Sequence, residues 1–365
     1  MFEFLNGNKN HFIGIDFGIS SIKVVELSYK DQQAHLENYG VVDLDWISST
    51  GQVTSSNASY EQKLNDALKS LVEKMNLKHG SQTFVSIPGF SGLITIIELP
   101  EMAQDELANA IQFEAHKYIP SSLDEVAMSW EIIEYVDAQA GSQGQTKDGG
   151  KKIKVLLVAA PKKDIEHYGR LVAGTNLQVS AIELETFSIE RSLVGEDSGT
   201  FLIIDIGSHA TNIILVEKGV VRVNRNIDAG GNEITIAISD SMKISRQRAE
   251  AFKCGEKDFL NTTESSFIVP VLELIVGESR RILSAYLEKN NNSKIDAMFL
   301  SGGTAKMKGI EQYFSRALGQ PVTIGNPWRR ITFDDNAKHL VENLGASFSV
   351  AIGLALRGLD EHKRK

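Results

Sequence analysis

The chain has 365 residues, of which 42% are hydrophobic and 23% are charged, with a formal net charge of −9. This length is enough for two or three compact domains, and the acidic balance argues against nucleic acid as a partner, because neutralising phosphates requires clustered Lys and Arg. The single cysteine, Cys254, excludes an intrachain disulfide framework and a cysteine-rich zinc site. No apolar run approaches the ~20 residues of a membrane span, and the first residues do not resemble a signal peptide. We therefore expect a cytoplasmic protein that reaches a membrane only through partners.

An internal repeat is the strongest organisational signal. The segments Ile13–Leu27 and Leu202–Val216 each contain an apolar run, an Asp-x-Gly, a short polar stretch and a second apolar run. Runs of Ile and Val broken by Gly and Ser are typical of two strands joined by a tight turn. Two such hairpins about half a chain apart predict a duplicated domain.

Between the two copies, the sequence predicts a further unit. A turn-rich loop (48–59) precedes an amphipathic helix (59–77), and two strands follow within Gln82–Pro100. A second helix starts near Gln104, with an expected buried face of Leu107, Ile111, Ala115 and Tyr118. Two more strands, within 127–136 and 152–160, flank a Gly- and Lys-rich linker (137–152). We interpret residues 83–160 as a small α+β unit inserted into the first lobe.

The remaining elements follow in chain order. A helix (161–177) and a strand (178–184) lead into the second hairpin, and a helix rich in small residues is expected within 346–358. The predicted domains are a first lobe of 1–82, 161–199 and 345–365, the inserted unit, and a second lobe of 200–344.

Glycine-rich turns are the candidate phosphate-binding elements. Beyond the two hairpins, Gly-Gly pairs precede a predicted helix in 228–235 and another in 299–310. Glycine allows a backbone to approach an anion closely, and N–H groups at the start of a helix attract negative charge. Taken alone, each hairpin is equally typical of an ordinary turn, and each Gly-Gly pair is more typical of an ordinary loop. Their order along the chain therefore carries the information.

That order resembles the actin/Hsp70 superfamily, and several segments are similar to the PilM family of type IV pilus assembly proteins. They are "GIDFGISSIKVVEL", "LPEMAQDELANAIQFEAHKYIP", "DAGGNEIT", "RAEAFK", "IDAMFLSGGTAKMKGI" and "SVAIGLALRG". The resemblance implies an α/β, duplicated, RNase H-like two-lobed fold, in which the inserted unit is the 1C (SHS2-like) subdomain shared with the division protein FtsA.

The resemblance also implies a site for ATP or ADP with Mg²⁺. The first phosphate loop would comprise Asp16, Gly18, Ser20, Ser21 and Lys23. The second would comprise Asp205, Gly207 and Thr211, with Asp16 and Asp205 closest to Mg²⁺ and bound to it through water. Gly230 and Gly231 would approach the phosphates, Glu250 and Lys253 would reach the ribose or adenine, and Gly302, Gly303, Lys306 and Met307 would border the base.

Two departures from the family pattern weaken the expected contacts with the terminal (γ) phosphate of ATP. Ile19 occupies a position where the family usually has Ser, and the second loop reads "DIGSHAT" rather than Asp-x-Gly-Gly-Gly-Thr. We predict nucleotide binding with slow or negligible hydrolysis, and no catalytic residue can be assigned.

The resemblance implies an adaptor function. The partner would be the N-terminal cytoplasmic tail of a PilN-like inner-membrane protein, held in a groove between the first lobe and the inserted unit, with pilus motor ATPases and platform proteins as further partners. Two alternatives stay open. An FtsA-like filament protein would need an amphipathic membrane helix, which the C-terminal residues do not supply, and a small-molecule kinase would need a catalytic base.

Overall fold

The computed structural model describes residues 10–44, 58–77, 80–136, 151–261, 269–290 and 293–364. It divides into two compact units, a larger one of Met1–Pro88 with Tyr168–Lys365 and a smaller one of Gly89–His167. Most of the predicted loop 48–59 and of the linker 137–152 lies outside the described residues.

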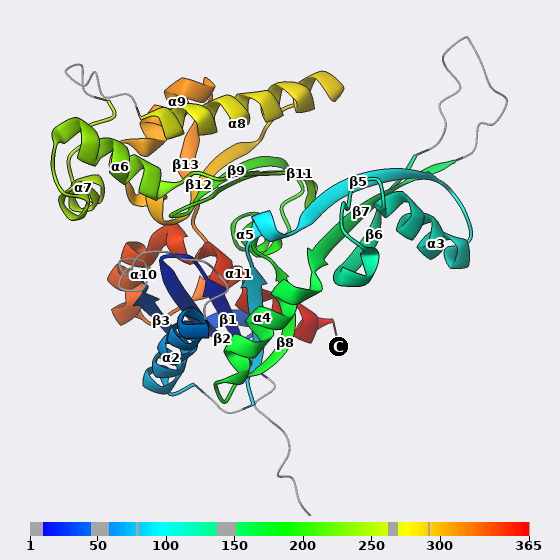
Figure 1. The fold of residues 1–365 in the computed structure, drawn as a ribbon, viewed down its shortest axis with the longest axis horizontal. Coiled ribbons are helices and arrows are strands. Elements are labelled where there is room, and N and C mark those ends of the chain that lie inside the picture. The colour runs from blue at the N-terminus through cyan, green and yellow to red at the C-terminus, as the bar shows by residue number, and fades with distance from the viewer. Residues whose placement is uncertain are drawn as a thin grey trace, which may run out of the picture. The chain divides into compact units, whose positions relative to one another are not determined.

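The first sheet of the larger unit, whose strands β1, β2, β3 and β8 are labelled in Figure 1, has the order β14-β3-β2-β1-β4-β8. Strands β1, β2 and β3 form an antiparallel meander, while β4 and β8 continue the sheet parallel to β1. The bounds are His11–Phe17 for β1, Ser21–Lys30 for β2, Gln33–Asp43 for β3, Gln82–Ile87 for β4, Gln178–Leu184 for β8 and Ile331–Thr332 for β14.

The second sheet repeats this arrangement. Its order is β11-β10-β9-β12-β13, with β9, β10 and β11 as the antiparallel meander and β12 and β13 parallel to β9. The bounds are Thr200–Ile206 for β9, Thr211–Glu217 for β10, Val220–Ile227 for β11, Ala297–Ser301 for β12 and Val322–Ile324 for β13. Because β9 occupies the position that β1 has in the first sheet, the predicted duplication of the hairpins is confirmed at the level of whole sheets.

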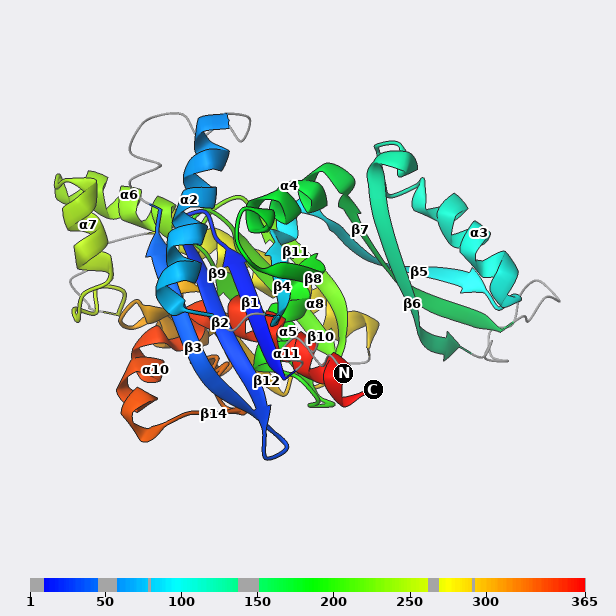
Figure 2. The ribbon, with the colours of Figure 1, turned by 90° about the horizontal axis from the view of Figure 1, so that it is seen from below.

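Helices cover both sheets. In the first lobe they are α2 (Ala58–Met75), α4 (Lys162–Ala173), α5 (Glu185–Leu193) and α11 (Ser349–Lys363). In the second lobe they are α6 (Gly231–Met242), α7 (Arg246–Lys253), α8 (Pro270–Lys289), α9 (Ile310–Leu318) and α10 (Lys338–Leu344). Short 3-10 turns are η1 (Gly89–Ser91), η2 (Leu123–Glu125), η3 (Gly303–Lys306), η4 (Asp335–Ala337) and η5 (Gly345–Phe348). Figure 2 shows α2 lying along the β1–β3 meander.

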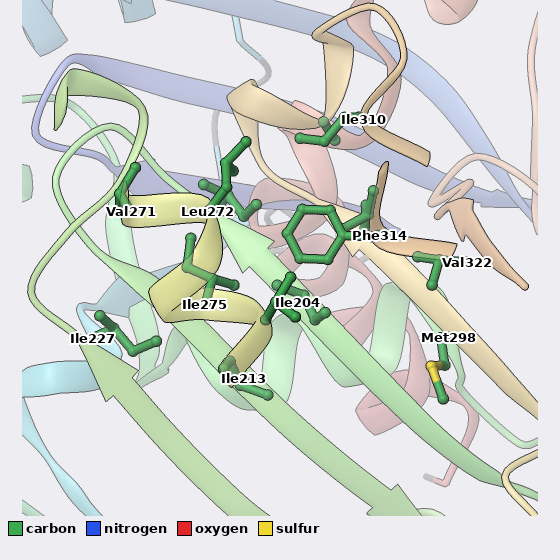
Figure 3. Packing of buried hydrophobic residues seen from close by; sticks show 14 of the residues in the cluster. Ile204, Ile213, Ile227, Val271, Leu272, Ile275, Met298, Ile310, Phe314 and Val322 are labelled. Carbon is green, nitrogen blue, oxygen red and sulfur yellow. The ribbon is translucent and has the colours of Figure 1, made fainter. Parts of the chain in front are cut away.

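The core of the second lobe fixes the strands that end at the candidate site. Leu272 and Ile275 of α8 pack with Ile204 of β9 and Phe314 of α9, and all four are fully buried (Figure 3). Burying each such side chain stabilises the folded state by roughly 1.5–3 kcal/mol. This packing holds the end of β9, where Asp205 lies, against a rigid layer.

Helices α5 and α11 cross at a backbone-to-backbone contact. A Cβ atom at Gly353 of α11 would lie 1.8 Å from the Ser188 carbonyl oxygen of α5, and one at Gly14 of β1 would lie 2.0 Å from the Ala351 carbonyl oxygen of α11. Only glycine permits these approaches. The predicted small-residue helix, α11, is therefore packed between β1 and α5.

One described helical stretch, Asp335–Lys363, is long and apolar enough to cross a membrane by composition. Its most apolar window is 61% buried inside the protein, and α11 supplies most of its fully buried residues, such as Ile352 and Leu354. The same pattern is expected of a core helix.

The smaller unit is a three-stranded antiparallel sheet with one helix. The sheet order is β5-β7-β6, and the bounds are Leu93–Pro100 for β5, Gln104–Ala115 for helix α3, Val126–Val136 for β6 and Lys152–Pro161 for β7. Figure 2 shows α3 running along one face of this sheet. Leu107, Ile111 and Ala115 are buried against it. Tyr118 was wrongly expected on that face, because the helix ends at Ala115 and the Tyr118 side chain is 43% exposed.

Two predicted boundaries differ from the strand pairing. The predicted unit 83–160 includes β4, but β4 pairs with β1 and so belongs to the first sheet. The predicted second lobe 200–344 includes β14, which pairs with β3. Both strands are short apolar segments whose pairing partners are distant in sequence, so composition alone does not assign them to a sheet.

Candidate nucleotide-binding site

The first hairpin brings a carboxylate and an ammonium group together. Asp16 is the penultimate residue of β1 and is buried, and Lys23 lies opposite it on β2. The Lys23 Nζ atom lies 3.4 Å from Asp16 Oδ2, and the Ser86 hydroxyl of β4 donates to Asp16 Oδ1 at 3.4 Å. Asp16 is therefore held from two sides by neighbouring strands.

The second hairpin places Asp205 at the equivalent position of β9. Asp205 pairs in register with Asn212 of β10 on one side and Ser301 of β12 on the other. Burial raises the pKa of the Asp205 carboxyl to about 6, and the negative charge of Asp16 adds to the rise, while Ser301 and Lys23 oppose it. The Asp16 carboxylate of the first lobe thus lies close enough to Asp205 of the second lobe to raise the Asp205 pKa.

Asp16 and Asp205 are not part of a larger group of metal-ligating side chains among the described residues. Within the described parts of the chain, no group of three or more His, Cys, Asp and Glu side chains is arranged to hold a metal ion. Mg²⁺ sites with nucleotides commonly use one or two carboxylates, with phosphates and water completing the octahedron. Asp16 and Asp205 match that smaller donor set.

The turn glycines allow close backbone packing, but three of their amides are already engaged. Gly207 N–H donates to Ala210 O, Gly230 N–H to Glu233 Oε2, and Gly231 N–H to Gly207 O, at 2.7–2.9 Å. A Cβ atom at Gly230 would lie 2.6 Å from Gly207 O. These glycines therefore join α6 to the second hairpin, and the approach of Gly230 and Gly231 to the phosphates stays a prediction.

Four other residues of the two hairpins have structural roles. Thr211 is fully buried and its hydroxyl donates to Ala229 O at 2.8 Å, which removes it as a phosphate donor. The Ser20 carbonyl accepts from Leu44 N–H at 2.8 Å, and Ser21 is buried as the first residue of β2. Gly18 lies in the first turn, where a Cβ atom would lie 2.9 Å from Ser21 O.

Lys253 is a packing residue rather than a free cation. Its Nζ atom contacts Gly231 O at 3.0 Å, Thr235 Oγ1 at 2.9 Å and Glu250 Oε2 at 2.7 Å, and the residue is 7% exposed. An ammonium group has three donors, so all of them are used within α6 and α7. The expected contact of Lys253 with the ribose or adenine is not available in this arrangement, whereas the Glu250 side chain is 49% exposed.

The segment after β12 divides into buried and exposed residues. Gly302 has φ +85°, and a Cβ atom there would lie 2.4 Å from Ile206 O, so glycine is required where η3 meets β9. Gly303 is exposed, with open space around it. Met307 is 3% exposed within the second-lobe core, so its expected place beside the base is wrong.

Lys306, like Lys308, is exposed in this segment. Burial by neighbouring atoms and the positive charge of Lys23 lower the pKa of Lys306. The charges of Lys23 and Lys306, which belong to opposite lobes, therefore lie close enough to interact, an arrangement that favours an anion near them.

Sequence reasoning missed four polar residues that border the aspartates. Asn212 Nδ2 donates to Glu185 Oε1 at 2.7 Å at the start of α5, and Ser86 and Ser301 flank Asp16 and Asp205. The signal available for Asn212 was one amide inside the apolar run Thr211–Val216. Nothing comparable distinguishes Ser86 or Glu185 from ordinary polar residues at strand ends.

A family model described as "Type IV pilus assembly protein PilM" matches residues 14–359 of the chain. The chain belongs to the PilM family. The match covers both hairpins, the inserted unit and most of α11, so the resemblance expected from the sequence is confirmed.

Similarity to solved structures agrees with the fold. The PilM-PilN type IV pilus biogenesis complex superposes with a TM-score of 0.74 at 23% identity, covering 95% of this chain and 98% of that one. EutJ from Carboxydothermus hydrogenoformans gives 0.52 at 17% identity, covering 95% and 89%. MreB5 of Spiroplasma citri bound to ADP gives 0.51 at 12% identity, covering 97% and 98%. The predicted actin-like, two-lobed α/β fold is therefore confirmed.

More distant curated relatives are cell division proteins. FtsA of Streptococcus pneumoniae is 22% identical over 301 residues, covering 78% of this chain and 64% of FtsA. FtsA of Neisseria meningitidis is 23% identical over 282 residues, covering 70% and 66%. The chain thus spans slightly less than two thirds of the length of these two relatives.

Proposed function

We propose that this PilM-family protein is a cytoplasmic, nucleotide-binding adaptor of a type IV pilus inner-membrane platform. ATP or ADP with Mg²⁺ binds where the two hairpins meet, and the N-terminal tail of a PilN-like membrane protein binds to the inserted unit. The observation that carries the proposal is the family match over residues 14–359, which includes both hairpins and the inserted unit.

The charges at the hairpins support a nucleotide with a divalent cation. Lys23 and Lys306 supply positive charge for phosphates, and Asp16 and Asp205 supply oxygens for the cation. The Asn212 Oδ1 atom is buried and has no hydrogen-bond partner among the described residues, so it is available to accept from a bound water or a hydrated ion. Mg²⁺ would neutralise phosphate charge when bound, and these residues fit that group. MreB5, which shares the fold, has been solved with ADP.

The face of the inserted sheet opposite α3 supports binding of an extended peptide. Leu93, Ile97 and Leu99 of β5 face α3 in the core, so alternation puts Ile94 and Ile96 on the opposite face. Both are only partly buried, and β5 is an edge strand of its sheet. An edge strand offers unpaired backbone groups to an added strand, and adjacent apolar side chains select its sequence.

The test is a calorimetric titration with the N-terminal tail peptide of the PilN-like protein from the same source, with and without Mg-ATP. We expect the tail to bind, to bind more tightly with Mg-ATP, and to bind Lys23→Ala without that increase, because the two sites are coupled. Ile96→Lys should weaken tail binding about tenfold or more. Phe113→Ser, which changes a 73% exposed residue of α3, is the control.

Other outcomes separate the alternatives. No tail binding, together with nucleotide-dependent polymers, would favour a filament protein like FtsA. Transfer of phosphate to a sugar or carboxylic acid would favour a small-molecule kinase. Slow or negligible hydrolysis is expected, because the exposed Ile19 in the first turn offers no hydroxyl to the terminal phosphate. A turnover of about 1–100 per second, as in kinases, would contradict that expectation.

A further inference from the structure

The two hairpins, which the duplicated fold makes equivalent, carry different charges at matching positions. In the first sheet, Asp16 lies opposite Lys23 on the adjacent antiparallel strand. In the second, Asp205 lies opposite Asn212. Opposite residues of adjacent strands project from the same face, with Cβ atoms about 4.5–5.5 Å apart. One aspartate therefore has a cationic neighbour and the other has a neutral amide.

This difference leaves the two carboxylates in different electrostatic states. Asp16 pairs with Lys23 at 3.4 Å and accepts from Ser86 at 3.4 Å. Asp205 forms no ion pair with any residue that the structure describes. Its strand neighbours, Asn212 and Ser301, are neutral. The charge that still requires a counter-ion is therefore in the second lobe.

Asn212 adds an unused acceptor next to that charge. The residue is 2% exposed, its Nδ2 atom donates to Glu185 Oε1 at 2.7 Å, and its Oδ1 atom finds no donor in the described part of the chain. A buried carbonyl oxygen without a donor is costly unless water or a ligand supplies one. Because Nδ2 is fixed by Glu185, the orientation of Oδ1 is fixed as well.

We propose that Asn212 is a further cation-positioning residue of the nucleotide site: waters bound to the divalent cation donate hydrogen bonds to Asn212 Oδ1 and to the Asp205 carboxylate, while Lys23 of the first hairpin contacts phosphate. Mg²⁺ keeps several of its waters in protein sites, and a second acceptor beside the carboxylate orients them. Asp16 also orients Lys23 through their 3.4 Å ion pair. This inference rests on the proposed nucleotide site and adds Asn212 to the residues expected to serve Mg²⁺.

The experiment compares ATP affinity by calorimetry in Mg²⁺ and in EDTA, and takes the ratio of the two dissociation constants as the metal enhancement. For Asp205→Asn and Asn212→Leu, we expect the enhancement to fall about tenfold or more, while the affinity for ATP in EDTA stays within about twofold of wild type. Asn212→Asp keeps an acceptor oxygen and should keep the enhancement. Lys23→Met should weaken ATP binding about tenfold in both media, because it removes a charge-assisted contact.

A matched control and a second readout complete the test. Asn224 lies on the next strand, β11, and its Oδ1 atom already accepts from Thr186 at 3.2 Å, so Asn224→Leu should leave the enhancement unchanged. Circular dichroism checks that each variant is folded. Mn²⁺ paramagnetic resonance with ATP should show the bound-ion signal lost in Asn212→Leu and retained in Asn224→Leu.

Three results would overturn the proposal. The first is an unchanged metal enhancement in Asn212→Leu. The second is a metal enhancement that falls as much in Asn212→Asp as in Asn212→Leu. The third is a wild-type protein that binds ATP equally well with and without Mg²⁺. In each case nucleotide binding itself would stand. Absence of any ATP binding by the wild-type protein would instead remove the proposed nucleotide site, and this inference with it.

Discussion

Replacing Gly353 with alanine tests the crossing of α5 and α11. The added Cβ atom would lie 1.8 Å from the Ser188 carbonyl oxygen and 2.8 Å from the Ser188 Cα atom. Ordinary contact begins near 3.4 Å, so the two helices must separate by about 1.6 Å. Both obstructing atoms are backbone, so no side-chain rotation relieves the clash.

The expected cost follows from what the separation disturbs. Overpacking a well-packed core costs about 1–3 kcal/mol, and more where the backbone must move. The same substitution gains up to about 1 kcal/mol of helix propensity. We expect a net loss of at least about 2 kcal/mol in the free energy of unfolding, because α11 also packs on β1 through Gly14.

The assay is urea unfolding of Gly353→Ala beside Gly277→Ala. Gly277 lies within α8, and a Cβ atom there would meet nothing within 4 Å. Gly277→Ala should therefore stabilise the protein by about 0.5–1 kcal/mol. Equal stability of the two variants would show that α5 and α11 do not cross at this distance, and would refute the reasoning.

Three further substitutions test the buried charges. Burial raises the pKa of Glu190 to about 7, so the wild-type protein should lose stability as pH rises from about 4.5 to 7. In urea unfolding, Glu190→Gln should therefore be more stable than wild type at pH 8 by up to about 3 kcal/mol, and should show no such gain at pH 5. Glu183→Gln should lower the free energy of unfolding at pH 7 by about 3–5 kcal/mol in the same assay, because it removes the carboxylate that pairs with Arg191 at 2.7 Å and Arg357 at 3.0 Å. A loss below about 1 kcal/mol would contradict the pairing. Lys253→Met should lower the melting temperature measurably, and a variant with unchanged stability but weakened adenosine binding would restore Lys253 as a nucleotide ligand.

Local patterns in the sequence predicted much of the fold. The two Asp-x-Gly hairpins, the amphipathic helix α2 and the buried face of α3 at Leu107, Ile111 and Ala115 are properties of residues close in the chain. Their periodicity and turn chemistry do not depend on distant partners. Family resemblance then supplied the order of the elements, and with it the actin-like architecture.

Only the tertiary structure decided which candidate residues are buried or already hydrogen-bonded within the protein. In the sequence, Met307 resembles a residue of an exposed loop, but the second-lobe core buries it. Lys253 resembles a residue of an exposed helix face, but all three of its donors are used by groups of α6 and α7. Asn212 drew no attention in the sequence, and only the register of β10 against β9 sets it beside Asp205. Burial, register and hydrogen-bond satisfaction are set by contacts between segments far apart in the chain, so no local pattern encodes them.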